Sequence, residues 1–148
     1  MNRDKKDDLS VCLVQMSSTP DLDENLKQAR EFIKEAAQKQ NDLIIFPECA
    51  LLWAKTAITH SQAKSRSQWR ALLTSLASEN EIAIIWGGLA EREGEKVFNS
   101  SFIFNAQGHL LDVYRKTHLF QIFRPGKKAI DETETYDHGD SDPCIVNI

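Results

Sequence analysis

Two separated residues, Glu48 and Lys116, have the types and settings that acid–base chemistry needs. Glu48 follows an apolar run and a proline, so its carboxylate is predicted to project from a strand end into a crevice. Loss of solvent there would raise its pKa toward that of a general base. Lys116 follows another apolar segment, where a fixed ammonium could stabilise a developing oxyanion. Taken singly, each residue fits an ordinary solvent-exposed turn better.

The sequence shows no nucleophile in a suitable setting to act with Glu48 and Lys116. The sequence has three cysteines, Cys12, Cys49 and Cys144, and their spacing fits neither a zinc site nor a disulfide framework. Reduced thiols in the cytoplasm are therefore expected. Cys12 falls inside an apolar run, Cys49 adjoins Glu48, and Cys144 precedes the last apolar run. None of these settings is one that would lower the pKa of a thiol.

No metal and no organic cofactor is predicted. The acidic stretch at residues 131–140 lacks the spacing of a calcium loop, so a solvated loop is favoured over a metal site. The four histidines show no ligand spacing. Neither a P-loop nor a Gly-x-Gly-x-x-Gly motif occurs, and nucleotide binding therefore has no support.

The composition is that of one globular domain. The 148 residues are 41% hydrophobic and 27% charged, which suffices for a core of ordinary size. A net charge of −4 argues against nucleic acid or an anionic membrane as a partner. No apolar run approaches the ~20 residues that span a bilayer. Residues 1–8 are charged and are predicted to form a disordered tail before a domain at residues 9–148.

Apolar periodicity predicts the elements that would position Glu48 and Lys116. The pattern is that of an α/β protein whose strands are covered by helices. Residues 54–66 give no clear pattern, and residues 121–143 indicate an irregular loop. The expected elements are strands at 11–16, 43–46, 82–88 and 145–148, helices at 22–39 and 67–79, and a hairpin of 97–105 with 110–115.

Taken together, the motifs resemble the N-terminal half of the nitrilase superfamily of carbon–nitrogen hydrolases. Within it the chain is most similar to the branch of ω-amidases and deaminated-glutathione amidases. The similarity covers residues 9–148 and depends on the order and spacing of several short pieces. These are Gln15, Phe46-Pro47-Glu48, Gly87-Gly88 with Glu91-Arg92, Val97-Phe98-Asn99-Ser100, the run from Tyr114 to Phe120, and Glu132 before Gly139-Asp140.

The resemblance implies a role for each matching residue. Glu48 would be the general base that takes a thiol proton and later activates water, and Lys116 would stabilise the tetrahedral oxyanion. Glu132 falls at the position of a second glutamate, which helps to position the substrate and the lysine. A cysteine would attack the amide carbon and expel ammonia, and the thioester would then be hydrolysed. The implied substrate is a small amide that carries a carboxylate.

The resemblance also implies an α-β-β-α sandwich, of which this sequence would supply only part. The family places its cysteine on a strand-to-helix turn after the position of Ile148, so the C-terminal half is expected to be absent and the lone chain inactive. An alternative is a non-catalytic assembly module that pairs with itself, as a homo-oligomer, or with a full-length homologue. A third possibility is that a separate chain carries the cysteine half.

Overall fold

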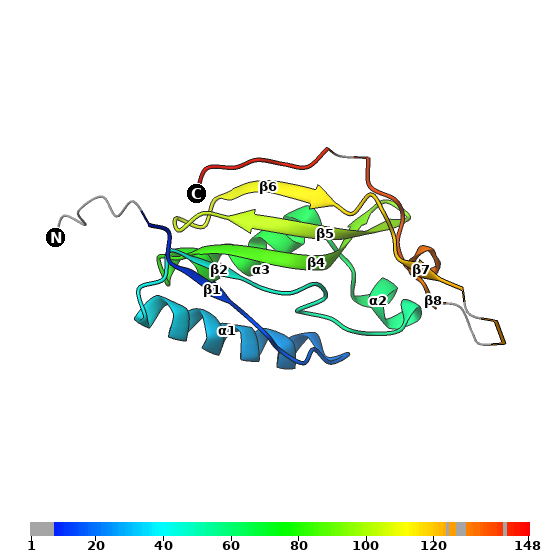
Figure 1. Cartoon of the computed structure of the whole chain (residues 1–148), viewed down its shortest axis with the longest axis horizontal. Coiled ribbons are helices and arrows are strands. Elements are labelled where there is room, and N and C mark those ends of the chain that lie inside the picture. Colours follow the sequence, from blue (N-terminus) through cyan, green and yellow to red (C-terminus); the bar gives the residue numbers. More distant parts are fainter. Residues whose placement is uncertain (1–7, 124, 127–129, 141) are drawn as a thin grey trace.

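A six-stranded mixed β-sheet forms the body of the protein (Figure 1). The computed structural model describes residues 8–123, 125–126, 130–140 and 142–148, so the predicted tail lies outside the described residues except for Asp8. The sheet order is β1 (Val11–Leu13), β2 (Leu43–Ile45), β4 (Ala83–Glu93), β5 (Lys96–Phe104) and β6 (Leu110–Arg115), with β3 (Lys64–Ser65) beside β4. Strands β1, β2 and β4 are parallel, and β4, β5 and β6 form an antiparallel meander.

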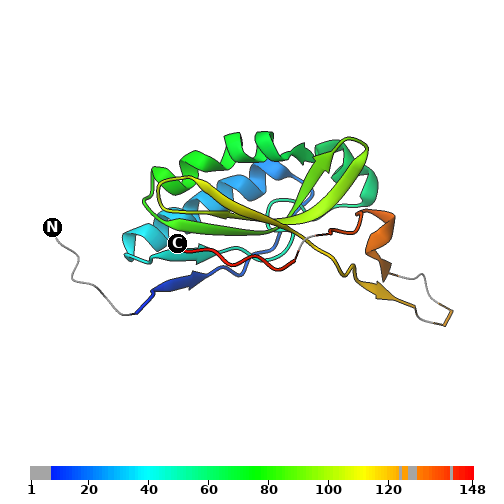
Figure 2. The same cartoon turned by 90° about the horizontal axis from the view of Figure 1, so that it is seen from above.

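Two long helices, α1 (Leu22–Gln38) and α3 (Arg66–Ser78), lie on the same face of the sheet (Figure 2). The carboxylate of Asp21 caps α1 by accepting from the first backbone N–H groups. Ser65 and Gln68 form a reciprocal capping box at the start of α3. A short helix, α2 (Thr56–Gln62), precedes β3. None of the helices in the described part of the chain is long and apolar enough to cross a membrane.

The core lies between the two long helices and one face of the sheet. Helix side chains such as Ile33 and Leu73 are fully buried against the strands. The Phe46 and Trp86 rings stack there with centroids 4.2 Å apart. Because side chains alternate along a strand, the other face carries a second apolar set, and no helix in Figure 2 covers it. Leu13 on that face is 76% exposed.

The α/β architecture, both long helices and the hairpin of β5 and β6 are confirmed, and several element boundaries differ. The expected strand at 11–16 ends at Leu13. The strand expected to stop at residue 88 continues to Glu93, because a bulge between Trp86 and Leu89 absorbs the two glycines without ending the ladder. Residues 54–66, which gave no clear pattern, form α2 and β3.

The C-terminal part of the chain departs most from expectation. Residues 121–143 are not simply irregular, since they contain the paired strands β7 (Gln121–Ile122) and β8 (Ile130–Asp131) and a 3₁₀ turn, η1 (Glu132–Glu134). The expected strand at 145–148 is wrong, because that segment has no strand pairing in the described chain. Ile145 there is 97% exposed. An apolar run becomes a strand only where a neighbouring strand supplies backbone partners.

Candidate active site

Glu48 sits on the turn that follows β2, and the bulge of β4 packs directly beneath it. Gly88 in that bulge has a φ of +61°, in the left-handed region that favours glycine. A Cβ at Gly88 would lie 2.8 Å from both Cys49 N and Glu48 Cγ. The pair of glycines therefore lets the two backbones approach closely enough to hold the Glu48 carboxylate over the end of the sheet.

The three residues expected to carry chemistry lie together. Lys116 Nζ is 2.9 Å from Glu48 Oε1 and 2.9 Å from Glu132 Oε2, so the ammonium bridges two carboxylates. Asn99 on β5 donates from Nδ2 to the same Glu48 oxygen at 2.7 Å. The backbone N–H of Lys116 donates to the carbonyl of Asn99 at 2.8 Å. We call Glu48, Asn99, Lys116 and Glu132 the open cluster.

Glu132 is positioned by a loop that α2 helps to hold. The backbone N–H of Phe120 donates to Glu132 Oε2 at 2.7 Å, and the N–H of Glu132 donates to the Phe120 carbonyl at 3.0 Å. Further along the loop, the Thr135 side chain hydrogen-bonds Thr56 and its carbonyl oxygen lies 2.7 Å from His60 Nε2. The segment at residues 54–66 thus fixes the turn that carries Glu132.

The charges of the open cluster stabilise one another. Burial acts to raise the pKa of Glu48, but hydrogen bonds from Lys116 and Asn99 outweigh it, and that pKa lies below its ordinary value of 4.5. The expectation of a raised pKa is therefore wrong, because it considered desolvation without the ammonium. Burial acts to lower the pKa of Lys116, but the hydrogen bonds and charges of Glu132 and Glu48 outweigh it. The pKa of Lys116 therefore lies above its ordinary value. Near neutral pH, the carboxylate is ready to accept a proton and the ammonium to bind an oxyanion.

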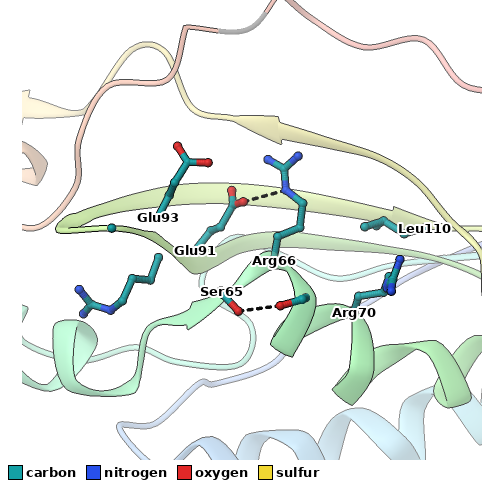
Figure 3. Close-up of a pocket in the computed structure, with 9 residues that line it drawn as sticks. Ser65, Arg66, Arg70, Glu91, Glu93 and Leu110 are labelled. Atoms are coloured by element: carbon teal, nitrogen blue, oxygen red, sulfur yellow. Dashed lines mark hydrogen bonds and ion pairs between the residues drawn. The ribbon is translucent and has the colours of Figure 1, made fainter.

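A shallow hollow adjoins Glu48. Its volume is about 280 Å³, which would admit a small molecule, and its lining residues are Met16, Ser17, Ser18, Glu48, Cys49 and Trp53. A larger hollow of about 580 Å³, lined by Arg66, Glu91 and Leu110 among others, has no member of the open cluster in its lining (Figure 3). The smaller hollow therefore reaches the open cluster through Glu48.

None of the three cysteines combines a place at the hollow with an activated thiol. Cys49 lines the hollow, but burial and the charge of Glu48 raise its pKa to about 11. Cys144 has a raised pKa, from burial and from the nearby Asp112. Cys12 packs against the core, on the helix-covered face. In the described part of the chain, no group of three or more His, Cys, Asp or Glu residues could hold a metal ion.

Asn99 is the member of the open cluster that sequence reasoning missed. Asn99 belongs to one of the short pieces that carry the family resemblance, but the sequence alone predicts no role for it. The available signal is its polarity, because an amide is unusual within the buried strand β5 and a buried polar group needs a partner. Its partner is the Glu48 carboxylate.

The fold is that of an α/β protein, and the open cluster places an ammonium between two carboxylates at the end of its sheet. A sequence model of the carbon–nitrogen hydrolases matches residues 10–146, and the chain belongs to this family, within the nitrilase superfamily. The chain is 37% identical over 132 residues to omega-amidase NIT2-A of Xenopus laevis, covering 88% of this chain and 48% of that protein. It is 33% identical over 147 residues to omega-amidase NIT3 of Saccharomyces cerevisiae, covering 93% and 50%. The expected similarity to the ω-amidase branch is confirmed.

Solved structures share the fold. The NitFhit protein of C. elegans superposes with a TM-score of 0.75 at 25% identity, over 88% of this chain and 32% of that chain. An amidase from Nesterenkonia sp. AN1 superposes with a TM-score of 0.78 at 21% identity, over 95% and 53%. The chain spans about half the length of the curated relatives that it matches.

Proposed function

We propose that the chain supplies the acid–base and oxyanion groups of a thiol-dependent amidase site, whose cysteine comes from protein outside these 148 residues. The observation that carries this proposal is the Lys116 ammonium, held 2.9 Å from each of two carboxylates, of which Glu48 borders a hollow. The similarity to omega-amidases favours a small ω-amide as the substrate. One structure of the Nesterenkonia amidase contains acrylamide added at the active site cysteine, so a thiol serves that relative.

The mechanism assigns one task to each charged group. Glu48 accepts the thiol proton, and the thiolate attacks the amide carbon to form a tetrahedral intermediate. Lys116 stabilises the negative oxygen, and Glu48 returns its proton to the nitrogen that leaves as ammonia. Glu48 then takes a proton from the water that attacks the thioester, and returns it to the departing thiolate, which gives the acid and the free thiol. Asn99 and Glu132 hold Glu48 and Lys116 in place.

The uncovered face of the sheet supports the idea that this fold is half of an α-β-β-α sandwich. Val11 and Leu13 on β1, which alternate with the side chain of Cys12 on the core face, are exposed there. Burying such a surface against a second sheet would gain about 25 cal/mol for each Å² removed from water. A second sheet would also bring further loops to the edge that holds Glu48.

Ammonia release tests this function. The purified chain, given the monoamide of succinic acid, is expected to release none above the uncatalysed rate. Mixed with the C-terminal half of an omega-amidase relative, it is expected to release ammonia, and Glu48→Gln should abolish that release. Ammonia release by the chain alone that survives Glu48→Gln would contradict the proposal.

A second candidate function, favoured by the same uncovered face, is an assembly module that pairs with itself or with a full-length homologue. Light scattering across a concentration range would show a dimer that Leu13→Lys disrupts. Leu9→Lys is the matched control, because Leu9 is also exposed but precedes β1. A monomer at every concentration, with no pairing to a relative, would contradict this candidate.

A further inference from the structure

A second polar cluster lies on the helix-covered face of the strands that carry the open cluster. Glu91 of β4 has a side chain only 1% exposed. It accepts hydrogen bonds from the Arg115 guanidinium at 2.9 and 3.0 Å, from Ser100 Oγ at 2.8 Å and from Arg66 Nε at 2.8 Å. Arg115 also donates to Glu93 at 3.0 and 3.1 Å. We call Arg66, Glu91, Glu93, Ser100 and Arg115 the buried cluster.

The contacts of Glu91 come from two directions. Figure 3 shows Arg66 reaching it from α3, across the larger hollow, and this arginine side chain is 49% exposed. Arg115 approaches from β6, is 11% exposed and lies with its guanidinium carbon 4.0 Å from the centre of the Phe98 ring. Arg66 is thus the solvent-side contact, whereas Arg115 and Ser100 are the contacts within the sheet.

The two clusters are joined through neighbouring residues of the same strands. Side chains alternate along a strand, so Ser100 faces the helices and the preceding Asn99 faces the open side, where it binds Glu48. In the same way, Arg115 shares a face with the core residue Val113, and the next residue, Lys116, lies on the other side. Each sheet contact of Glu91 is therefore adjacent in sequence to a residue that holds the Glu48 carboxylate.

We propose that Glu91 is a positioning residue for Lys116 and Asn99, a role that rests on the proposed amidase function of the open cluster. By binding Arg115 and Ser100 together, Glu91 fixes the parts of β5 and β6 from which Asn99 and Lys116 reach one oxygen of Glu48. Such positioning matters because a misplacement of about 1 Å can lower a catalysed rate roughly 100-fold.

The pKa of Glu48, measured by carbon-13 NMR titration in Glu91→Gln, separates positioning from simple electrostatics. Removing the negative charge of Glu91 without other change would lower the pKa of Glu48. Loosening Lys116 and Asn99 would raise it, because they stabilise the ionised carboxylate. The other groups that face this site, Glu132, Cys49 and Tyr136, are unchanged in the variant. We expect the pKa of Glu48 to rise, and a fall or no change would overturn the proposal.

Arg66→Gln is the matched control. It removes the solvent-side contact of Glu91 and leaves Arg115 and Ser100 in place. The pKa of Glu48 is expected to match that of the parent chain. A rise as large as the one in Glu91→Gln would overturn the proposal, because the contacts of Glu91 with Arg115 and Ser100 are intact in this control.

A double variant keeps the test decisive if Glu91→Gln does not fold. Replacing both partners, with Glu91→Leu and Arg115→Met, leaves no buried charge alone and tends to preserve a fold. The pKa of Glu48 is expected to rise here too, and an unchanged low value would overturn the proposal. The titration measures geometry and not turnover, so its outcome is independent of the ammonia assay that tests the amidase function.

Discussion

The open cluster and the buried cluster occupy opposite faces of the same strands, and they differ in how far their charges are satisfied. Glu91 is 1% exposed and bound by two arginines, whereas Glu48 is 53% exposed and borders a hollow. Both are glutamates at a strand or its end, with a lowered pKa. The buried, fully paired Glu91 thus stabilises the fold, whereas the ionised but accessible carboxylate of Glu48 can still accept a further partner.

Replacing Glu91 or Glu48 should produce the largest difference in unfolding free energy between the two clusters. Glu91→Ala leaves Arg115 buried without its main partner, and the expected loss is about 3–5 kcal/mol of unfolding free energy. Glu48→Ala removes an accessible ion pair and should change the unfolding free energy by no more than about 1 kcal/mol. Urea denaturation of the two variants measures both values. Equal losses of unfolding free energy in the two variants would contradict the inferred difference between the buried and the open cluster.

Acid should weaken the buried cluster in a definite pH window. Burial acts to raise the pKa of Glu91, but the hydrogen bonds from Arg115 and Arg66 outweigh it and lower that pKa from 4.5 to about 2. The stabilisation is fully present above the unfolded-state value and is lost as pH falls toward about 2. It amounts to something on the order of 3 kcal/mol. Unfolding free energies measured across this window should show the loss in the parent chain, and Glu91→Gln should lack it.

Substitution of two glycines with similar backbone angles can separate the energetic cost of a left-handed conformation from the cost of close packing. Gly94 and Gly88 have φ values of +59° and +61°, but only Gly88 has atoms within 4 Å of a Cβ position. Gly94→Ala should cost about 1 kcal/mol, for the left-handed conformation alone. Gly88→Ala should cost about 1–3 kcal/mol more, because the new methyl group meets Glu48 and Cys49. Similar unfolding energies for the two would mean that the bulge does not support Glu48.

The smallest change in stability is expected for Lys116→Met. The ammonium is accessible enough that its loss should alter the unfolding free energy by less than about 1 kcal/mol. The pKa of Glu48 should nevertheless rise, since its main cationic partner is gone. An NMR titration of Glu48 checks the direction. An unchanged pKa would show that Lys116 does not contact Glu48 in solution.

The sequence predicted the elements that depend on local patterns. The long helices follow from apolar spacing, and the grouping of Glu48, Lys116 and Glu132 was expected from a family resemblance. What it could not predict depends on distant partners. The direction of the Glu48 pKa shift needed the distance to Lys116, and the role of Asn99 needed the register of β5. The segment at 145–148 has the composition of a strand but pairs with neither edge of the sheet in the described chain.

Treatment of the chain with acrylamide, followed by mass spectrometry of the modified cysteines, tests whether the open cluster lacks its own nucleophile. Because the pKa of Cys49 is raised to about 11, its thiolate fraction should be roughly 100-fold below that of an ordinary thiol. Cys49 is expected to be alkylated more slowly than an unfolded control peptide, and Glu48→Gln is not expected to slow the alkylation further. Fast, selective alkylation of Cys49 that depends on Glu48 would show instead that the chain holds a nucleophile activated by this cluster.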